Sequence, residues 1–91
     1  MIEISEADLH PHLKARMSQR GITIEEIERV LNEGWEATDA KPGTLGKVLV
    51  FLYNGIWGGK LYEEKEVSVY YRVVNNRVSL LTVKARYGKG F

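Results

Sequence analysis

Three polar side chains that could act together on a phosphodiester lie near the N-terminus. His12, Arg16 and Arg20 are spaced four residues apart, which places them along one stripe of a helix. An imidazole exchanges protons near neutral pH, and guanidinium groups bind phosphate through paired hydrogen bonds. The pattern predicts metal-independent RNA cleavage, with His12 and Arg16 as catalytic residues and Arg20 as a phosphate ligand. The alternative is a solvated helix flank in which His12 packs locally and has no catalytic role.

A second group, of cations and aromatic rings, lies near the C-terminus. From residue 67 onward the chain has five basic residues and no acid. Rings interleaved with cations are typical of single-stranded RNA binding, so we expect RNA to contact Tyr70, Arg72, Lys84 and Arg86. The net charge is only +1, and no RNP motif, KH loop or zinc knuckle accompanies these residues. The alternative is that the acidic segments pack beside these bases and neutralise them.

Metal and cofactor chemistry is not expected. His10 and His12 are two residues apart, which places them about 200° apart around a helix, so they cannot face one metal ion. The chain has no cysteine, which excludes disulfides, thiolate metal sites and a cysteine nucleophile. Gly58-Gly59-Lys60 lacks the Ser or Thr that follows the lysine of a phosphate loop. The sequence therefore predicts neither a metal site nor a cofactor.

Two helices and a hairpin must position the candidate groups. Pro11 suits the first turn of a helix that we expect to end at Arg20, just before a glycine. Thr23 and Glu26 form a capping box, which predicts a second helix that ends at Glu33.

Strand signals fill the rest of the chain. The apolar run 48–53 predicts a strand that is covered on both faces. Residues 66–74 and 77–86 alternate and predict a hairpin. Residues 56–57 are expected in a loop, because Asn-Gly precedes them and Gly-Gly follows. Short strands are also expected near residues 2–4 and 35–38.

The turn Asn75-Asn76 determines the register of the predicted hairpin, since asparagine tolerates positive φ. In a regular register, the face under the helices consists of Val67, Val69, Tyr71, Val73, Val78, Leu80, Thr82 and Lys84. The opposite face mixes large apolar side chains with polar ones. Either another segment covers part of this mixed face or it receives a ligand.

The helical segments read His12-x3-Arg16-Met17-x2-Arg20-Gly21-Ile22-Thr23-x2-Glu26-Ile27, and the hairpin ends in Leu81-Thr82-Val83. This pattern resembles a bacterial domain-of-unknown-function family. Its members look like distant relatives of the RelE and BrnT toxins, within the barnase/EndoU/colicin/RelE ribonuclease fold group. The resemblance spans about residues 10 to 87 and implies two N-terminal helices on an antiparallel, RelE-like sheet. It also implies a ribonuclease ancestry, with His12, Arg16 and Arg20 at the polar positions of the motif.

Length and composition are those of one small globular domain. The chain has 91 residues, of which 44% are hydrophobic and 27% charged. We expect a single domain over residues 1–91 with an α+β fold, in which two N-terminal helices pack on one face of a twisted antiparallel sheet of three to four strands. No apolar segment approaches the roughly 20 residues that span a bilayer, so we expect a cytoplasmic protein without membrane contact.

Two hypotheses for the function follow. The first is a toxin-type ribonuclease, with RNA as substrate and a cognate antitoxin-like protein as partner. The second is a non-catalytic module that binds nucleic acid or protein on the same scaffold, and a homodimer through the mixed sheet face is a further alternative. The first hypothesis requires cations of the first helix and of the last two strands to meet in one water-accessible recess.

Overall fold

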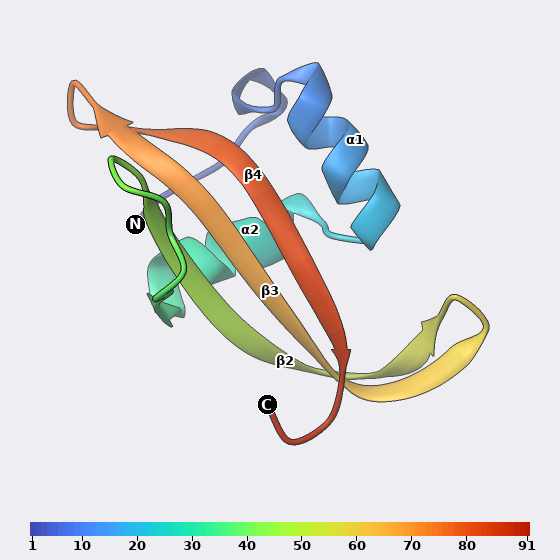
Figure 1. The fold of residues 1–91 in the computed structure, drawn as a ribbon. Coiled ribbons are helices and arrows are strands. Elements are labelled where there is room, and N and C mark those ends of the chain that lie inside the picture. Colours follow the sequence, from blue (N-terminus) through green and yellow to red (C-terminus); the bar gives the residue numbers. More distant parts are fainter.

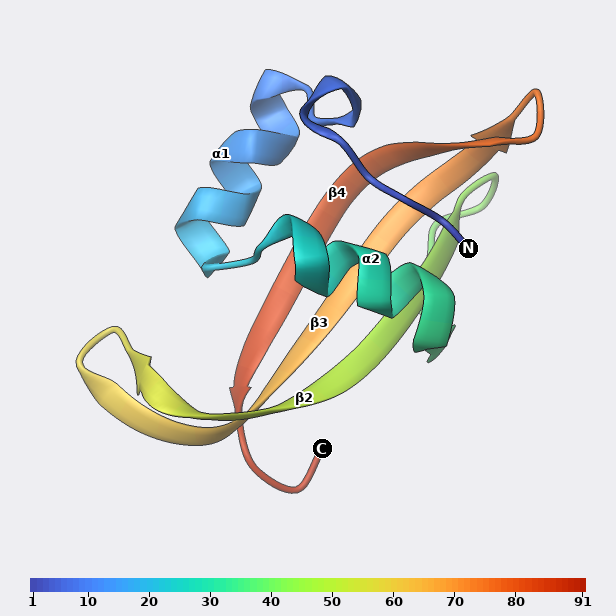
Figure 2. The same cartoon turned by 180° about the vertical axis from the view of Figure 1, so that it is seen from behind.

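The computed structural model describes residues 1–91 and contains two helices packed on a four-stranded antiparallel sheet (Figure 1). The helices α1 (Pro11–Arg20) and α2 (Ile24–Glu33) follow a short 3-10 turn at Glu6–Asp8. Both helices cover the same face of the sheet, which Figure 2 shows from the helix side. The predicted α+β fold is therefore confirmed. The strands lie in the sheet in chain order and are β1 (Trp35–Glu36), β2 (Leu45–Trp57), β3 (Lys60–Val74) and β4 (Arg77–Gly88).

Local capping interactions set the boundaries of both helices. The ring of His10 caps α1, because its Nδ1 accepts a 3.1 Å hydrogen bond from the backbone N–H of Leu13. α1 ends at Gly21, whose φ of +68° lies in the left-handed region that glycine favours. At the start of α2, both hydrogen bonds of the Thr23–Glu26 capping box are present, at 3.1 and 2.9 Å. No helix is long and apolar enough to cross a membrane.

The hydrophobic core fills the space between the helices and the sheet. Leu13 of α1 and Ile27 and Val30 of α2 are completely buried. They meet the side chains that β3 and β4 direct toward the helices. From the sheet, the core includes Val67, Val69, Tyr71, Leu80 and Val83.

The hairpin of β3 and β4 begins as the sequence predicts and then departs from the predicted register. Asn75 and Asn76 form the turn with φ of +53° and +62°, and the pairing is regular as far as Tyr71 opposite Leu80. Tyr70 then pairs with Thr82. One extra residue, Leu81, therefore forms a β-bulge in β4.

Beyond this bulge, each side chain of β4 lies on the face opposite to the predicted one. The prediction that Thr82 and Lys84 lie under the helices is wrong, because they pair with Tyr70 and Ser68 on the opposite face. A shift of one residue moves every later side chain to the other side of a sheet. The bulge also brings Val83 into the core, where it is completely buried, and this burial compensates for the irregular pairing.

β2 is longer than the sequence predicts. A second irregularity separates the pair Leu52–Glu64 from the pair Gly55–Tyr62, and Asn54 within it has a φ of +44°. The strand then continues to Trp57, so the predicted loop at residues 56–57 is wrong: Asn54 lies in a bulge, and Gly55 pairs again with Tyr62 of β3. The strand is also not covered on both faces, since Leu52 is 81% exposed.

The N-terminal residues 2–4 form no strand. The backbone of Ile2 instead makes two hydrogen bonds with the side chain of Asn32 at the end of α2, at 2.8 and 2.9 Å. The predicted short strand near residue 35 does form, as β1, which pairs with Lys47 and Val48 of β2.

Candidate nucleic-acid interface

The face of the sheet away from the helices, called the open face below, is partly covered by the segment between β1 and β2. Ala37 and Ala40 of this segment pack against Val48 and Tyr70. The expectation that another segment covers part of the mixed face is thus confirmed at its centre. The polar side chains that β3 and β4 place on the open face include those of Glu66, Ser68, Tyr70, Arg72, Arg77, Ser79, Thr82, Lys84 and Arg86.

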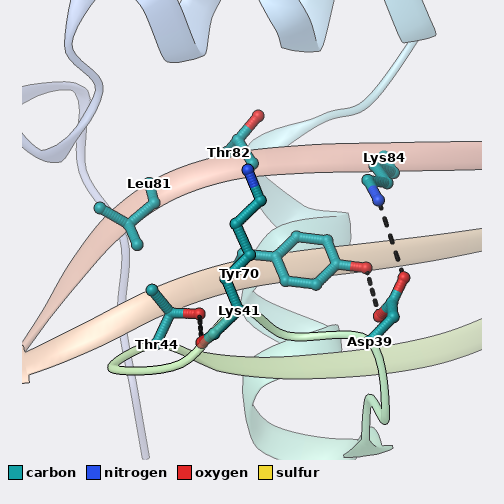
Figure 3. Close-up of a pocket in the computed structure, with 7 residues that line it drawn as sticks. All are labelled: Asp39, Lys41, Thr44, Tyr70, Leu81, Thr82 and Lys84. Carbon is teal, nitrogen blue, oxygen red and sulfur yellow. Dashed lines mark hydrogen bonds and ion pairs between the residues drawn. The ribbon is translucent and has the colours of Figure 1, made fainter.

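A cavity of about 360 Å³ lies on the open face beside Tyr70, between the sheet and the covering segment (Figure 3). The bulge residue Leu81 forms one apolar wall. Two ammonium groups, three hydroxyl groups and one carboxylate provide its polar lining. The lining residues are Asp39, Lys41, Thr44, Tyr70, Leu81, Thr82 and Lys84.

Asp39 joins two of these groups. Its Oδ1 accepts a 2.8 Å hydrogen bond from the Tyr70 hydroxyl, and its Oδ2 lies 3.7 Å from Nζ of Lys84. That ammonium also lies 5.1 Å from the centre of the Tyr70 ring. Burial and the hydrogen bond to Asp39 raise the pKa of Tyr70 to about 12. The same hydrogen bond lowers the pKa of Asp39, so the site pairs a neutral phenol with a charged carboxylate at neutral pH.

The cations of the open face differ in how far they are neutralised. Arg86 makes two hydrogen bonds to the carboxylate of Glu66, at 2.9 and 3.1 Å. Lys84 is only loosely paired, and its side chain is 58% exposed. Arg72 and Lys41 are exposed and make neither an ion pair nor a side-chain hydrogen bond. Lys41, Arg72 and Lys84 are therefore cations of the open face that a ligand can engage.

His12, Arg16 and Arg20 lie along α1 as their spacing predicts, but the structure adds no catalytic partner to them. The exposed ring of His12 makes no hydrogen bond and stacks on that of His10, with 6.1 Å between ring centres. The expectation that the two rings lie on opposite sides of a helix is wrong, because His10 is the N-cap and lies outside α1. Arg16 and Arg20 are half-buried and make no ion pair. Glu26, the nearest acid in the motif, is held by its capping box and by Lys65.

The helix group and the sheet group lie on different sides of the sheet. α1 packs beside β4 on the helix side (Figure 2), whereas Arg72 and Lys84 project from the open face. The structure does not bring the two groups into one recess, as the ribonuclease hypothesis requires. The catalytic roles of His12 and Arg16 and the phosphate contact of Arg20 stay predictions.

A second polar centre, around Lys65, is structural. This lysine is only 3% exposed, and its ammonium donates to the carbonyl of Gly21 and, at 2.8 Å, to Oε1 of Glu26. The rings of Tyr53 and Tyr87 each lie 5.6 Å from the same ammonium. Because it binds the end of α1 and the start of α2, Lys65 attaches both helices to the sheet.

Asp39, Lys41 and Thr44 are site residues that the sequence does not predict. They lie between β1 and β2, in a stretch that shows only a Lys-Pro-Gly turn signal and no periodicity. A weak signal existed, because the large apolar side chains of the mixed face predict either a covering segment or a ligand. Only the folded chain shows that this segment brings polar groups to the cavity.

Comparisons with known proteins do not identify a function for this chain. No protein-family model matches the chain, and neither the curated proteins nor the solved structures give a significant match. No group of three or more His, Cys, Asp or Glu side chains is placed to hold a metal ion. The cavity on the open face is therefore the candidate functional site.

Proposed function

We propose that the protein binds single-stranded RNA through the cavity and the neighbouring cations of the open face. The observation that carries this proposal is the position of Lys41 and Lys84 at one cavity, with Arg72 on the same face and no acid other than Asp39 in the lining. Lysine and arginine side chains provide most of the affinity of proteins for a phosphate backbone. The hydroxyl of Thr82 adds a donor for phosphate oxygens.

The ion pair between Lys84 and Asp39 is weak, so an RNA ligand can replace it. Lys84 and Asp39 are separated by 3.7 Å, and their side chains are 58% and 61% exposed. Exposed pairs of this kind contribute little to stability. An RNA ligand can therefore engage Lys84 at a low cost in free energy.

Tyr70 contributes the floor of the cavity and not a stacking platform. The residue is only 7% exposed, and an added Cβ on Gly46 would lie 3.0 Å from its ring carbons. Little of the ring is thus accessible to a base. The proposed binding depends mainly on charge and hydrogen bonds, so we expect it to weaken steeply as salt concentration rises.

Binding is tested by the fluorescence anisotropy of a labelled single-stranded RNA of mixed sequence. We expect Lys41→Ala and Lys84→Ala each to weaken binding. Lys41→Ala should also reduce the slope of log K against log salt by about 0.7, the value for one phosphate contact on a single strand. Lys14→Ala is the matched control, because Lys14 is an exposed lysine of α1 away from the open face. Equal losses in all three variants, or no binding by the unmodified protein at low salt, would refute the proposal.

Metal-independent cleavage of RNA, which the resemblance to RelE- and BrnT-type toxins implies, is a separate hypothesis. It would have to rely on the polar side chains of α1 alone, because the cations of the sheet lie on the other face. RNA is incubated with the purified protein in the presence of a chelator. Degradation that is lost in His12→Ala supports a catalytic His12. Degradation that persists in His12→Ala contradicts that role.

A homodimer through the open face would bury the same cavity. The mass in solution, measured by light scattering with and without RNA, tests this alternative. A dimer that dissociates when RNA is added would indicate that RNA and the second copy of the chain bind to the same open face.

A further inference from the structure

The carboxylate of Asp39 is positioned to do more than balance Lys84. Its Oδ1 accepts one hydrogen bond, from Tyr70, and its Oδ2 has only the ammonium 3.7 Å away. Each carboxylate oxygen can accept two hydrogen bonds. The side chain is 61% exposed at the wall of the cavity, so both oxygens retain lone pairs for a ligand.

Asp39 and Lys84 together present two acceptors followed by a donor. Figure 3 shows the two side chains side by side at one end of the cavity, with the Tyr70 ring between them and the rest of the lining. Among the RNA bases, only guanine presents two adjacent N–H donors, N1–H and the N2 amino group, next to an acceptor, O6. Adenine and cytosine each offer a single amino group, and uracil has one N–H between two carbonyls. The Watson–Crick edge of guanine is therefore the edge that matches this pair.

We propose that the cavity binds one unstacked guanine of a single-stranded RNA, with Asp39 accepting from N1–H and N2–H and Lys84 donating to O6. This inference rests on the proposed RNA-binding function and adds a base preference to it. Recognition of splayed-out bases by their Watson–Crick edges is the usual way in which proteins distinguish single-stranded RNA sequences.

The remaining walls of the cavity fit this ligand. Leu81 offers apolar surface to the plane of a base, and Thr82 lies beside it. Lys41 enters from the covering segment and can meet a phosphate of the same nucleotide. The cavity volume of about 360 Å³ lies within the range of roughly 300–1,000 Å³ that is typical of small-ligand sites.

The test compares short single-stranded RNAs that differ only in one central base. We expect the guanine oligomer to bind at least about tenfold more tightly than those with adenine, cytosine or uracil, as is usual for a bidentate base contact. An inosine oligomer lacks the N2 amino group and should bind with intermediate affinity. In Asp39→Asn the amide oxygen still accepts from Tyr70, but the amide N–H₂ opposes the donors of guanine, so the preference should disappear.

Glu63→Gln is the matched control, because it removes the same charge from an exposed position outside the cavity; it should keep the preference. Equal binding of all four bases, with binding still dependent on Lys41, would overturn the guanine inference and leave the proposed function intact. A preference for another base would overturn it as well. Failure of every oligomer to bind would instead overturn the proposed function.

Discussion

Nζ of Lys65 lies 2.8 Å from Oε1 of Glu26, in an ion pair whose lysine side chain is only 3% exposed. The same carboxylate oxygen accepts from the backbone N–H of Thr23 in the capping box of α2. One carboxylate thus ties the start of α2 to β3 and completes the cap of its own helix.

Lys65→Met should lower the free energy of unfolding by about 2–4 kcal/mol, because removing one partner of a buried pair leaves the other uncompensated. The carbonyl of Gly21 also loses its donor. Urea denaturation monitored by tryptophan fluorescence measures this loss. Arg29→Met is the control: it breaks the exposed Arg29–Glu33 pair, and it should leave the midpoint nearly unchanged. Similar effects of the two substitutions would contradict the role assigned to Lys65.

Gly21→Ala should destabilise the protein more than Gly43→Ala. Both glycines have positive φ, at +68° and +81°, and that conformation alone costs about 1 kcal/mol for alanine. A Cβ at Gly21 would in addition lie 2.5 Å from the ring of Trp57, whereas Gly43 faces open space. Thermal unfolding of the two variants measures the difference. Equal losses would show that the Trp57 ring moves away at no cost.

His10→Ala should lower stability by about 1 kcal/mol, the usual effect of losing an N-cap. Nδ1 of His10 accepts a hydrogen bond from the backbone N–H of Leu13. Nε2 lies 3.2 Å from the carbonyl oxygen of Leu80, which can only accept a hydrogen bond. The ring should therefore carry its proton on Nε2, which nitrogen chemical shifts can check. His12→Ala, by contrast, removes a ring without hydrogen bonds and should fold with unchanged stability. A large loss in His12→Ala would invalidate its use in the cleavage test.

Stability should fall at alkaline pH. Burial raises the pKa of both Tyr70 and Tyr87 to about 12, so the folded state favours the neutral phenols. Their contribution is complete below the ordinary tyrosine pKa of about 10 and is lost as pH rises through about 12. The ultraviolet absorbance of tyrosinate should show two of the five tyrosines ionising late in the folded protein. Tyr70→Phe should remove one of these late steps; a titration unchanged by this substitution would contradict the burial of its hydroxyl.

Local signals determined the helices and the turn between the last two strands. Pro11, Gly21 and the Thr23–Glu26 box act within a few residues of chain, so their effect does not depend on distant segments. The same holds for Asn75-Asn76, whose positive φ angles are a property of the turn itself. The α+β class follows from these elements and from the strand signals around them.

The tertiary structure alone decided which side chains share the cavity. The bulge at Leu81 depends on the fit of Val83 into a core built by helices far away in the chain, and no local pattern marks it. That single extra residue moves Lys84 to the open face, where a distant segment supplies Asp39 and Lys41. Sequence spacing brings together residues on one element, such as His12 and Arg16. Packing between elements determines which of these groups face the same space, because burial of apolar surface, and not the polar residues themselves, selects the register.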